Sequence, residues 1–437
     1  MHSRKPSAFI LTGAFWVICR SPLFLSSLLD REIKVLVITA AEWRDHAAAA
    51  MAQPGHPAAA IEDIAFVAGD SSMEGAFTAG AVAAASRWTD SYSIVGIHPV
   101  GETFVEPTGL LADALGLRSP GLRATRVCRT KYLQRWYLPE LSPASVVVPA
   151  TERASFDPDS VASFPCVLKP ANRHSSSGVV TVSDAAELAS RLQEYPLFET
   201  VLVEQKVEGQ EYSVESLVQD GKTVFASATR KQTTESHAST FVELVHAVPC
   251  EPDGPHAILH AANRRMLDLL AFENGIAHSE WRVDAARRTY LMEVASRTPG
   301  DGLMALYELA TGSPMEPEII RIMLGEPAAY PEMRRYARQI YLEHTPGTLK
   351  DVVVDWPSEV TPSWIGEKGL WPSIEPGPAD DAPALRAVLV LKERQSELTE
   401  LADSDDRAVT LFIDAATPEE LDVLEQRARQ AVRIVVT

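Results

Sequence analysis

The stretch HSEWRVDAARRTYLMEVASRTPGD, residues 278–301, decides the fold that we expect for this chain. It contains two acidic residues, Glu280 and Glu293, and each lies in an apolar, strand-like segment where Val or Ile would be ordinary. The polar segment 284–288 between them is typical of a turn, so the two segments are predicted to pair as a β-hairpin. Such a hairpin would bring the two carboxylates together.

Two carboxylates held close repel each other and are costly to desolvate unless a cation lies between them. Oxygen ligands favour Mg²⁺ over zinc, so Glu280 and Glu293 are predicted to bind magnesium. Arg297, four positions after Glu293, adds a permanently charged fork that suits a phosphoryl oxygen. The cluster therefore predicts a metal site that handles phosphate. The alternative is a hairpin whose acids simply point to solvent.

Length and composition limit the remaining possibilities. A chain of 437 residues suits two or three domains, and its 46% hydrophobic and 23% charged residues are typical of a soluble globular protein. The net charge of -19 argues against nucleic acid or an anionic membrane as the main partner. The four cysteines are widely spaced and form no CxxC motif, which predicts neither disulfides nor zinc and favours the cytoplasm.

The N-terminal segment allows two interpretations. An apolar run at residues 8–19 follows the basic pair Arg4-Lys5, as in a signal peptide. Arg20 interrupts this run, no small-x-small cleavage site follows promptly, and a second apolar run begins at Ile33. The order strand, helix, strand is therefore favoured, with a signal peptide as the alternative. No segment reaches the roughly 18 apolar residues that a membrane-spanning helix requires.

The first 122 residues alternate short apolar strands with Ala-rich helical stretches, which predicts a parallel sheet with helical crossovers. No GxGxxG motif occurs in this region, so a dinucleotide site is not indicated. The expected strands cover residues 33–38, 64–67 and 94–97, and the expected helices cover residues 22–31, 76–87 and 104–117.

The middle of the chain contains two segments suited to phosphate. Residues 126–138 predict one helix that carries Lys131 and Arg135 on the same face. A strand ending in Lys169 precedes the Ser-rich loop 171–178, whose backbone N–H groups and hydroxyls could surround phosphate oxygens. The loop is not a Walker A motif, and an ordinary flexible turn is the alternative.

Three further segments complete the expected site. The strand 201–207 runs into a linker whose backbone groups suit an adenine edge, with a plain strand and turn as the alternative. The polar segment 230–240 is expected to be a lid loop or a solvated surface loop. His246, in the strand 241–249, is either a substrate contact or a buried structural residue. Outside the expected site, residues 255–274 predict an amphipathic packing helix ended by Asn274-Gly275.

The last hundred residues look like a small α/β module. Thr417-Pro418-Glu-Glu420 predicts a helix start with a capping box. The expected strands lie near residues 339–343, 387–392, 409–413 and 432–436.

In this order, the motifs resemble those of the ATP-grasp superfamily of carboxylate-amine ligases, most closely the L-amino-acid (dipeptide) ligase branch. The implied fold mixes α/β and α+β: a Rossmann-like pre-ATP-grasp domain at 1–125, an ATP-grasp domain at 126–330 whose lid ends near 207, and a C-terminal module at 331–437. The motifs that carry the resemblance are Lys131, VLKP at 167–170, Ser176-x-Gly178, VEQ at 203–205, EGxE at 208–211, FVExxHxxP at 241–249, HxE at 278–280 and ExxxRxxGD at 293–301.

The resemblance also implies roles for single residues. ATP binding, with two subdomains enclosing the nucleotide, is implied for Lys131, Lys169, Ser176, Gly178, Glu204, Gln205, Val207 and Glu211. Catalysis is implied for Arg297 and Lys169, binding of one or two Mg²⁺ ions (or Mn²⁺) for Glu280 and Glu293, and substrate recognition for His246, Arg282, Gly300 and Asp301.

The implied reaction is the ATP-dependent joining of a carboxylate to an amine through an acyl phosphate, with release of ADP and phosphate. Amino acids are the expected substrates, and a homodimer is expected by analogy. The alternatives are acyl transfer to a thiol or carrier protein, and a nucleotide-binding regulatory module without turnover. One departure concerns the metal: many relatives carry Asn where this chain has Ala295. Water could replace that ligand, one metal could be held less firmly, or activity could be lost.

Overall fold

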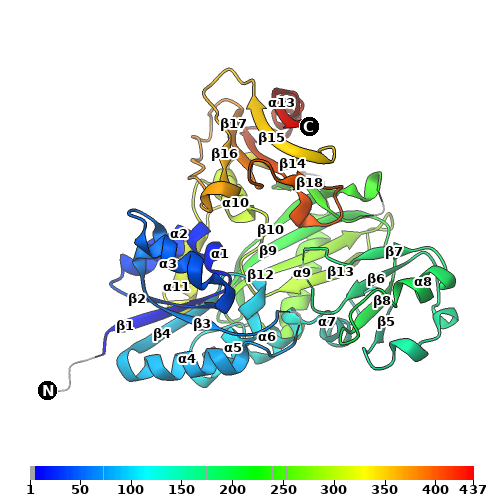
Figure 1. The fold of residues 1–437 in the computed structure, drawn as a ribbon, viewed down its shortest axis with the longest axis horizontal. Coiled ribbons are helices and arrows are strands. Elements are labelled where there is room, and N and C mark those ends of the chain that lie inside the picture. The colour runs from blue at the N-terminus through cyan, green and yellow to red at the C-terminus, as the bar shows by residue number, and fades with distance from the viewer. Residues whose placement is uncertain (1–4, 72, 174, 239, 251–253) are drawn as a thin grey trace.

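The computed structural model describes residues 5–71, 73–173, 175–238, 240–250 and 254–437. The chain begins in a lobe at the left of Figure 1, passes through a smaller lobe at the right and ends in a third lobe at the top. A large twisted sheet lies between these lobes. His2, Ser3, Arg4, His174 and Ser239, which belong to predicted segments, lie outside the described residues.

The N-terminal lobe contains the predicted parallel sheet, with strand order β3-β2-β1-β4. The apolar run near the N-terminus supplies β1 and then α1, so the strand, helix, strand interpretation is confirmed. Helices cover both faces of the sheet because its strands are apolar on both sides. The elements are β1 Ser7–Thr12, α1 Phe15–Arg20, α2 Pro22–Leu29, β2 Lys34–Ala40, α3 Arg44–Ala52, β3 Ile61–Val67, α4 Thr78–Ser91, β4 Ser93–Pro99 and α5 Val105–Ala114.

The connection to the second lobe corrects one prediction. Residues 126–138 form the end of α6 (Leu122–Arg129) and the whole of α7 (Lys131–Tyr137), not one helix. Thr130 between them has an extended backbone, with φ -131° and ψ 115°. Lys131 therefore begins α7, and its backbone N–H donates to the Ala171 carbonyl at 3.2 Å. The break fixes Lys131 against the Ser-rich loop.

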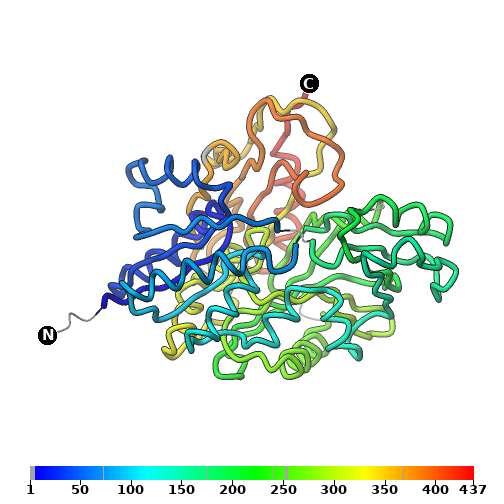
Figure 2. Tube along the Cα trace, turned by 60° about the horizontal axis from the view of Figure 1, so that its bottom comes forward, coloured from blue at the N-terminus to red at the C-terminus, as the bar shows by residue number. Residues whose placement is uncertain are grey.

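The right-hand lobe is the predicted lid, built on an antiparallel sheet of order β5-β8-β6-β7. Its own apolar core is small and includes Leu168, Leu188 and Val203. In the turned view of Figure 2 the lid again extends away from the N-terminal lobe. Its elements are β5 Ser145–Val148, β6 Cys166–Pro170, β7 Val180–Val182, α8 Ala185–Arg191 and β8 Val201–Gln205.

The central sheet has nine strands in the order β13-β12-β9-β10-β11-β14-β19-β17-β16. Its first five strands form the second half of the predicted ATP-grasp domain. They and their helices are β9 Gln210–Gln219, β10 Lys222–Thr233, β11 Glu243–Val248, α9 His256–Leu270, β12 Gly275–Val283, β13 Thr289–Ala295, α10 Leu303–Thr311 and α11 Glu316–Leu324.

Two predictions in this region are wrong in detail. The polar segment 230–240 is not all loop, because residues 230–233 complete β10 and pair with β11. Helix α9 ends at Leu270, and its C-cap Ala271 has a φ of 50°, so the helix stops before Asn274-Gly275. The backbone N–H groups of Glu273 and Asn274 donate instead to the carbonyls of Pro120 and Ser119.

The C-terminal segment contributes four strands to the central sheet and forms one small sheet of its own. Strands β14, β19, β17 and β16 extend the sheet beyond β11, and three others form a small sheet of order β18-β15-β20. The capping box at Thr417 is confirmed. The elements are β14 Tyr336–Leu342, β15 Gly347–Val354, β16 Ser363–Trp364, α12 Ile365–Lys368, β17 Ala384–Val390, β18 Glu397–Leu398, β19 Val409–Ala415, α13 Pro418–Ala431 and β20 Val432–Val436.

One apolar core joins the N-terminal lobe to the central sheet. It contains Phe24 and Leu28 of α2 together with Ile319 and Ile322 of α11. Burial of this shared core holds the two parts in one orientation. Among the described residues, no helix combines the length and the apolar character needed to cross a membrane.

Candidate active site

The predicted hairpin is confirmed. Strands β12 and β13 pair antiparallel, and Glu280 lies directly opposite Glu293. Both acids line a cleft between the lid sheet and the central sheet, with about 1100 Å³ of empty space when the part open to solvent is counted. The other predicted residues that line this cleft are Lys131, Lys169, Ser176, Glu204, Gln205, Val207, Glu211, Arg282 and Arg297.

Each acid of the hairpin has a lysine as its partner. Glu280 lies 2.5 Å from the Lys231 ammonium, and Glu293 lies 3.1 Å from the Lys131 ammonium. The prediction that only a metal ion could offset the repulsion between the two carboxylates is therefore corrected, because two lysines also offset it. Burial alone raises the pKa of Glu280, but Lys231 and His278 outweigh it and hold that pKa well below its usual range.

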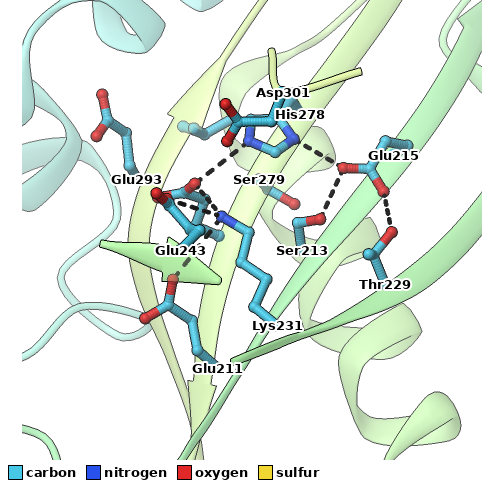
Figure 3. Close-up of polar contacts among 12 residues, drawn as sticks. Glu211, Ser213, Glu215, Thr229, Lys231, Glu243, His278, Ser279, Glu293 and Asp301 are labelled. Carbon is cyan, nitrogen blue, oxygen red and sulfur yellow. Dashed lines mark hydrogen bonds and ion pairs between the residues drawn. The ribbon is translucent and has the colours of Figure 1, made fainter. Parts of the chain in front are cut away.

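Lys231 is a site residue that sequence reasoning missed. It lies near the end of β10, and its buried ammonium is 3.7 Å from Glu211 and 3.7 Å from Glu243 (Figure 3). Carboxylate oxygens of Glu211, Glu243 and Glu280 lie within 4.8 Å of one another. Burial raises the pKa of Glu211, and the nearby cations do not fully offset it. We call the group formed by Lys231, Glu211, Glu243 and Glu280 the acidic floor of the cleft.

A second buried carboxylate fixes the acidic floor from behind. Glu215 is fully buried and lies 2.7 Å from Nδ1 of His278, whose Nε2 is 3.4 Å from Glu280 (Figure 3). Burial lowers the pKa of His278, but Glu215 and Glu280 outweigh it and the net shift is upward. A protonated His278 donates to both acids and so sets the direction of the Glu280 carboxylate. Glu215 also accepts hydrogen bonds from Ser213, Thr229 and Tyr307.

The lid side of the cleft has the opposite charge balance. The buried Glu204 carboxylate lies 2.6 Å from the Lys169 ammonium and 2.5 Å from Nε of Arg135. Burial raises the pKa of Glu204, but the two cations outweigh it and lower that pKa to about 2. Burial lowers the pKa of Lys169 to about 8. We call Arg135, Lys169 and Glu204 the hinge cluster.

The Ser-rich loop turns back sharply above this cluster. Ser175, Ser176 and Gly178 have φ values of 59°, 58° and 72°, in the left-handed region. The Ser176 hydroxyl donates to the Phe241 carbonyl at 3.3 Å, which joins the loop to the segment before β11. The left-handed backbone at position 178 favours glycine, and a side chain there would displace the tip of Arg173, which lies 2.9 Å away. Phosphate binding by the Ser-rich loop remains a prediction.

The predicted catalytic Arg297 is held by the N-terminal lobe. Its Nε donates to Glu102 at 2.8 Å, and its Nη1 donates to the Thr298 carbonyl at 2.8 Å. Glu102 follows β4 in a short turn and also lies 3.9 Å from Arg129. Sequence reasoning missed Glu102 because nothing in its local pattern indicates that it contacts a residue 195 positions away.

Two of the four predicted substrate residues, His246 and Arg282, are buried. Arg282 reaches the cleft lining, yet its guanidinium donates to the Val207 carbonyl at 3.0 Å and to Glu211 at 3.2 Å. His246 is fully buried, and burial lowers its pKa. Gly178, Gly300 and Asp301 join His246 as predicted site residues that do not belong to the cleft lining among the described residues.

The C-terminal segment reaches the same region. Arg407 lies 2.5 Å from Asp301, and this cation outweighs the effect of burial and lowers the pKa of Asp301. The hydroxyl of Ser404 donates to Glu243 at 2.8 Å, next to the acidic floor. No sequence motif indicated these contacts.

The donor set of the floor and hairpin fits a hard divalent cation. Glu280 and Glu293 offer carboxylate oxygens on neighbouring strands, and oxygen ligands suit Mg²⁺. Ala295 also lines the cleft but has no ligand atom. The carboxylates that line the cleft and could hold a metal are those of Glu280 and Glu293, together with Glu211 and Glu243 of the acidic floor.

Comparisons with known proteins agree with this architecture. Residues 162–304 match the ATP-grasp domain family. The L-amino acid ligase from Bacillus licheniformis superposes with a TM-score of 0.74 at 17% identity, over 100% of both chains. No curated protein matches the chain in sequence.

Two further solved structures are similar. Phosphoribosylglycinamide synthetase from Anaerococcus prevotii has a TM-score of 0.64 at 13% identity, over 99% of this chain and 100% of that one. The biotin carboxylase domain of 2-oxoglutarate carboxylase from Hydrogenobacter thermophilus, solved with MgADP and bicarbonate, has a TM-score of 0.64 at 13% identity, over 100% of this chain and 92% of that one. The predicted fold class is confirmed, and residues 162–304 of this chain belong to the ATP-grasp domain family.

Proposed function

We propose that the chain is an ATP-dependent carbon–nitrogen ligase that activates a carboxylate as an acyl phosphate and couples it to an amine, with release of ADP. The observation that carries this proposal is the charge arrangement of one cleft. Lys131, Lys169 and Arg297 supply cations for phosphate oxygens, and Glu280 and Glu293 face them from the hairpin. This arrangement is what transfer of a phosphoryl group requires.

Different residues of the cleft would bind the nucleotide, hold the metal ion and exclude water. The linker from Glu204 to Val207 and the side chain of Glu211 would hold adenine and ribose, and Lys131 and Lys169 would hold the phosphates. Glu280 and Glu293 would hold Mg²⁺, which when bound offsets the charge of the phosphates. The loop that contains Ser176 and Gly178 would exclude water, so that the acyl phosphate is not lost to hydrolysis.

Arg297 would stabilise the transferred phosphoryl group and then the tetrahedral intermediate formed by the amine. Glu102 keeps the plane of its guanidinium fixed. For the substrates we propose amino acids, because the fold spans the full length of an L-amino acid ligase. Substrate roles for His246, Arg282, Gly300 and Asp301, the domain boundaries, a cytoplasmic location and a homodimer remain predictions.

The test is ADP release with MgATP and amino acids, given singly and in pairs. A single amino acid carries both groups, so N-acetylated amino acids are added as carboxylates alone and amino acid amides as amines alone. We expect sustained ADP release only when a free carboxylate and a free amine are both present, together with a product whose mass is that of the two substrates minus water. The Glu293→Gln variant serves as the control for contaminating ATPases. ATP binding without ADP release, for any pair of acid and amine, would instead support a regulatory module. ADP release that requires a thiol would support acyl transfer to a carrier.

A further inference from the structure

Arg135 contacts both of the sheets that enclose the cleft. It belongs to α7, between the N-terminal lobe and the lid, and its side chain is only 3% exposed. Its Nε and Nη2 donate to the two oxygens of Glu204 on β8 at 2.5 and 3.2 Å. Its Nη2 also donates to the carbonyl of Met292 on β13, at 2.7 Å. Met292 directly precedes Glu293, so one guanidinium joins the lid strand to the hairpin.

Glu204 has two cations where one would neutralise it. Lys169 lies 2.6 Å from one carboxylate oxygen, and Arg135 grips both oxygens as a fork. Of the two cations, Lys169 lines the cleft, as Glu204 does. Arg135 approaches Glu204 from α7. The cation that faces the cleft is therefore not the sole cation that holds Glu204.

A phosphate entering the cleft would compete with Glu204 for Lys169. If Lys169 were the only cation at Glu204, its departure would leave a buried carboxylate without a partner, which is strongly unfavourable. With Arg135 in place, Glu204 stays paired when Lys169 turns to the phosphate. Arg135 also repels the Lys169 ammonium, which weakens the hold of Glu204 on it.

We propose that Arg135 is a positioning residue for phosphate binding, which holds Glu204 permanently so that Lys169 can bind a phosphate oxygen of the nucleotide. The inference rests on the proposed function, because that function places the phosphates at Lys169. It goes beyond that function by assigning a role to a side chain behind the cleft wall. A guanidinium is required, since only the fork spans both oxygens of Glu204.

The experiment compares ADP with adenosine as ligands, without Mg²⁺, by isothermal titration calorimetry. We expect Arg135→Met to weaken ADP binding by about tenfold to a hundredfold, the effect of losing one charge-assisted hydrogen bond. Adenosine has no phosphate, so its affinity should change by less than about threefold. A loss of packing at α7 would weaken both ligands alike and would contradict the proposal.

The rescue variant separates positioning from general structural damage. In Arg135→Met with Glu204→Gln, no buried carboxylate competes for Lys169, so ADP affinity should return to that of Glu204→Gln alone, within about threefold. Should Arg135→Met alone fail to fold, the double variant Arg135→Gln with Glu204→Gln keeps an amide pair at the site and must still bind ADP as Glu204→Gln does.

Failure of this inference differs from failure of the proposed function. ADP binding that is insensitive to Arg135→Met, or that Glu204→Gln does not restore, would overturn the role of Arg135 only. Wild-type protein that binds no ADP would overturn the proposed function, and this inference with it.

Discussion

The hinge cluster and the acidic floor are both built around one central charge with several partners of the opposite charge. The central charge is negative in the hinge cluster and positive in the floor. In the hinge cluster the Glu204 carboxylate lies between two cations, Arg135 and Lys169. In the floor the Lys231 ammonium lies among three carboxylates. Counted alone, the hinge cluster has one more cation than acids and the floor has two more acids than cations, although Arg282 and His278 also contact acids of the floor. The surplus of cations suits phosphate, and the surplus of acids suits a metal ion, so one cleft separates the two binding tasks by charge.

The largest expected effect comes from neutralising an acid of the hairpin. Glu293→Gln should reduce ADP formation by about a thousandfold or more, because a metal ion contributes several kcal/mol to stabilising the transition state. Glu293 is 28% exposed, and its partner Lys131 keeps a hydrogen bond to the Arg173 carbonyl, so the melting temperature should change slightly. A coupled ADP assay and a thermal melt measure the two quantities. Unchanged turnover in a folded variant would remove the metal role from this side of the cleft.

Removing the ammonium from the acidic floor should destabilise the fold. Lys231→Met removes the cation that the buried Glu243 shares with the half-buried Glu211 and Glu280. Arg282 and His278 remain beside two of these acids, so the free energy of unfolding should fall by about 3 kcal/mol, the low end for a broken buried pair. Denaturant titration measures the loss, and Mg²⁺ should recover part of it if the floor binds cations. Lys222→Met, at the exposed start of the same strand, is the matched control. Equal stability of the two variants would contradict the charge balance described for the floor.

Replacing the fork of Arg297 should reduce kcat by about a hundredfold. Lysine keeps the charge, but it lacks the planar fork that holds Glu102 with one nitrogen and leaves others directed at a phosphoryl oxygen. Arg288→Lys is the control, because Arg288 lies on the exposed turn of the same hairpin and is 70% exposed. Near-normal turnover of Arg297→Lys would show that charge alone is enough there.

The smallest expected effect is a pH dependence of ADP binding. Burial lowers the pKa of Lys169 from 10.5 to about 8, so the lysine is charged below that pH and becomes neutral above it. Only the charged form attracts phosphate, so ADP affinity should fall as pH rises from 7 to 9, by at most tenfold per unit. Lys169→Arg should flatten this part of the profile, since arginine stays charged. An identical fall in both proteins would assign the titration to another group.

Local patterns predicted the parts of the site that lie on regular strands. The hairpin register followed from apolar segments around Glu280 and Glu293, and the parallel sheet followed from alternating strands and helices. The sequence did not indicate Lys231 as a site residue, because the end of β10 is polar and its pattern does not differ from that of the loop that follows. The break at Thr130 between α6 and α7 was missed for a similar reason, since helix propensity there gives no warning.

The remaining site residues come from distant parts of the chain. Glu102 reaches Arg297 from the N-terminal lobe, and Ser404 and Arg407 reach Glu243 and Asp301 from the C-terminal segment. Such contacts depend on how lobes pack, which periodicity within a segment does not encode. The extension of the central sheet by C-terminal strands, such as β14, was missed on the same ground.

The central claim is that the cleft converts a carboxylate into an acyl phosphate. The direct measurement uses a carboxylate substrate labelled with ¹⁸O on both oxygens, MgATP and an amine, with mass analysis of the released phosphate. If the claim is right, each phosphate carries one ¹⁸O atom, because the carboxylate oxygen that attacks the γ-phosphate leaves with it when the amine displaces it. Phosphate without the label would contradict the claim, since it would mean that water and not the carboxylate had accepted the phosphoryl group.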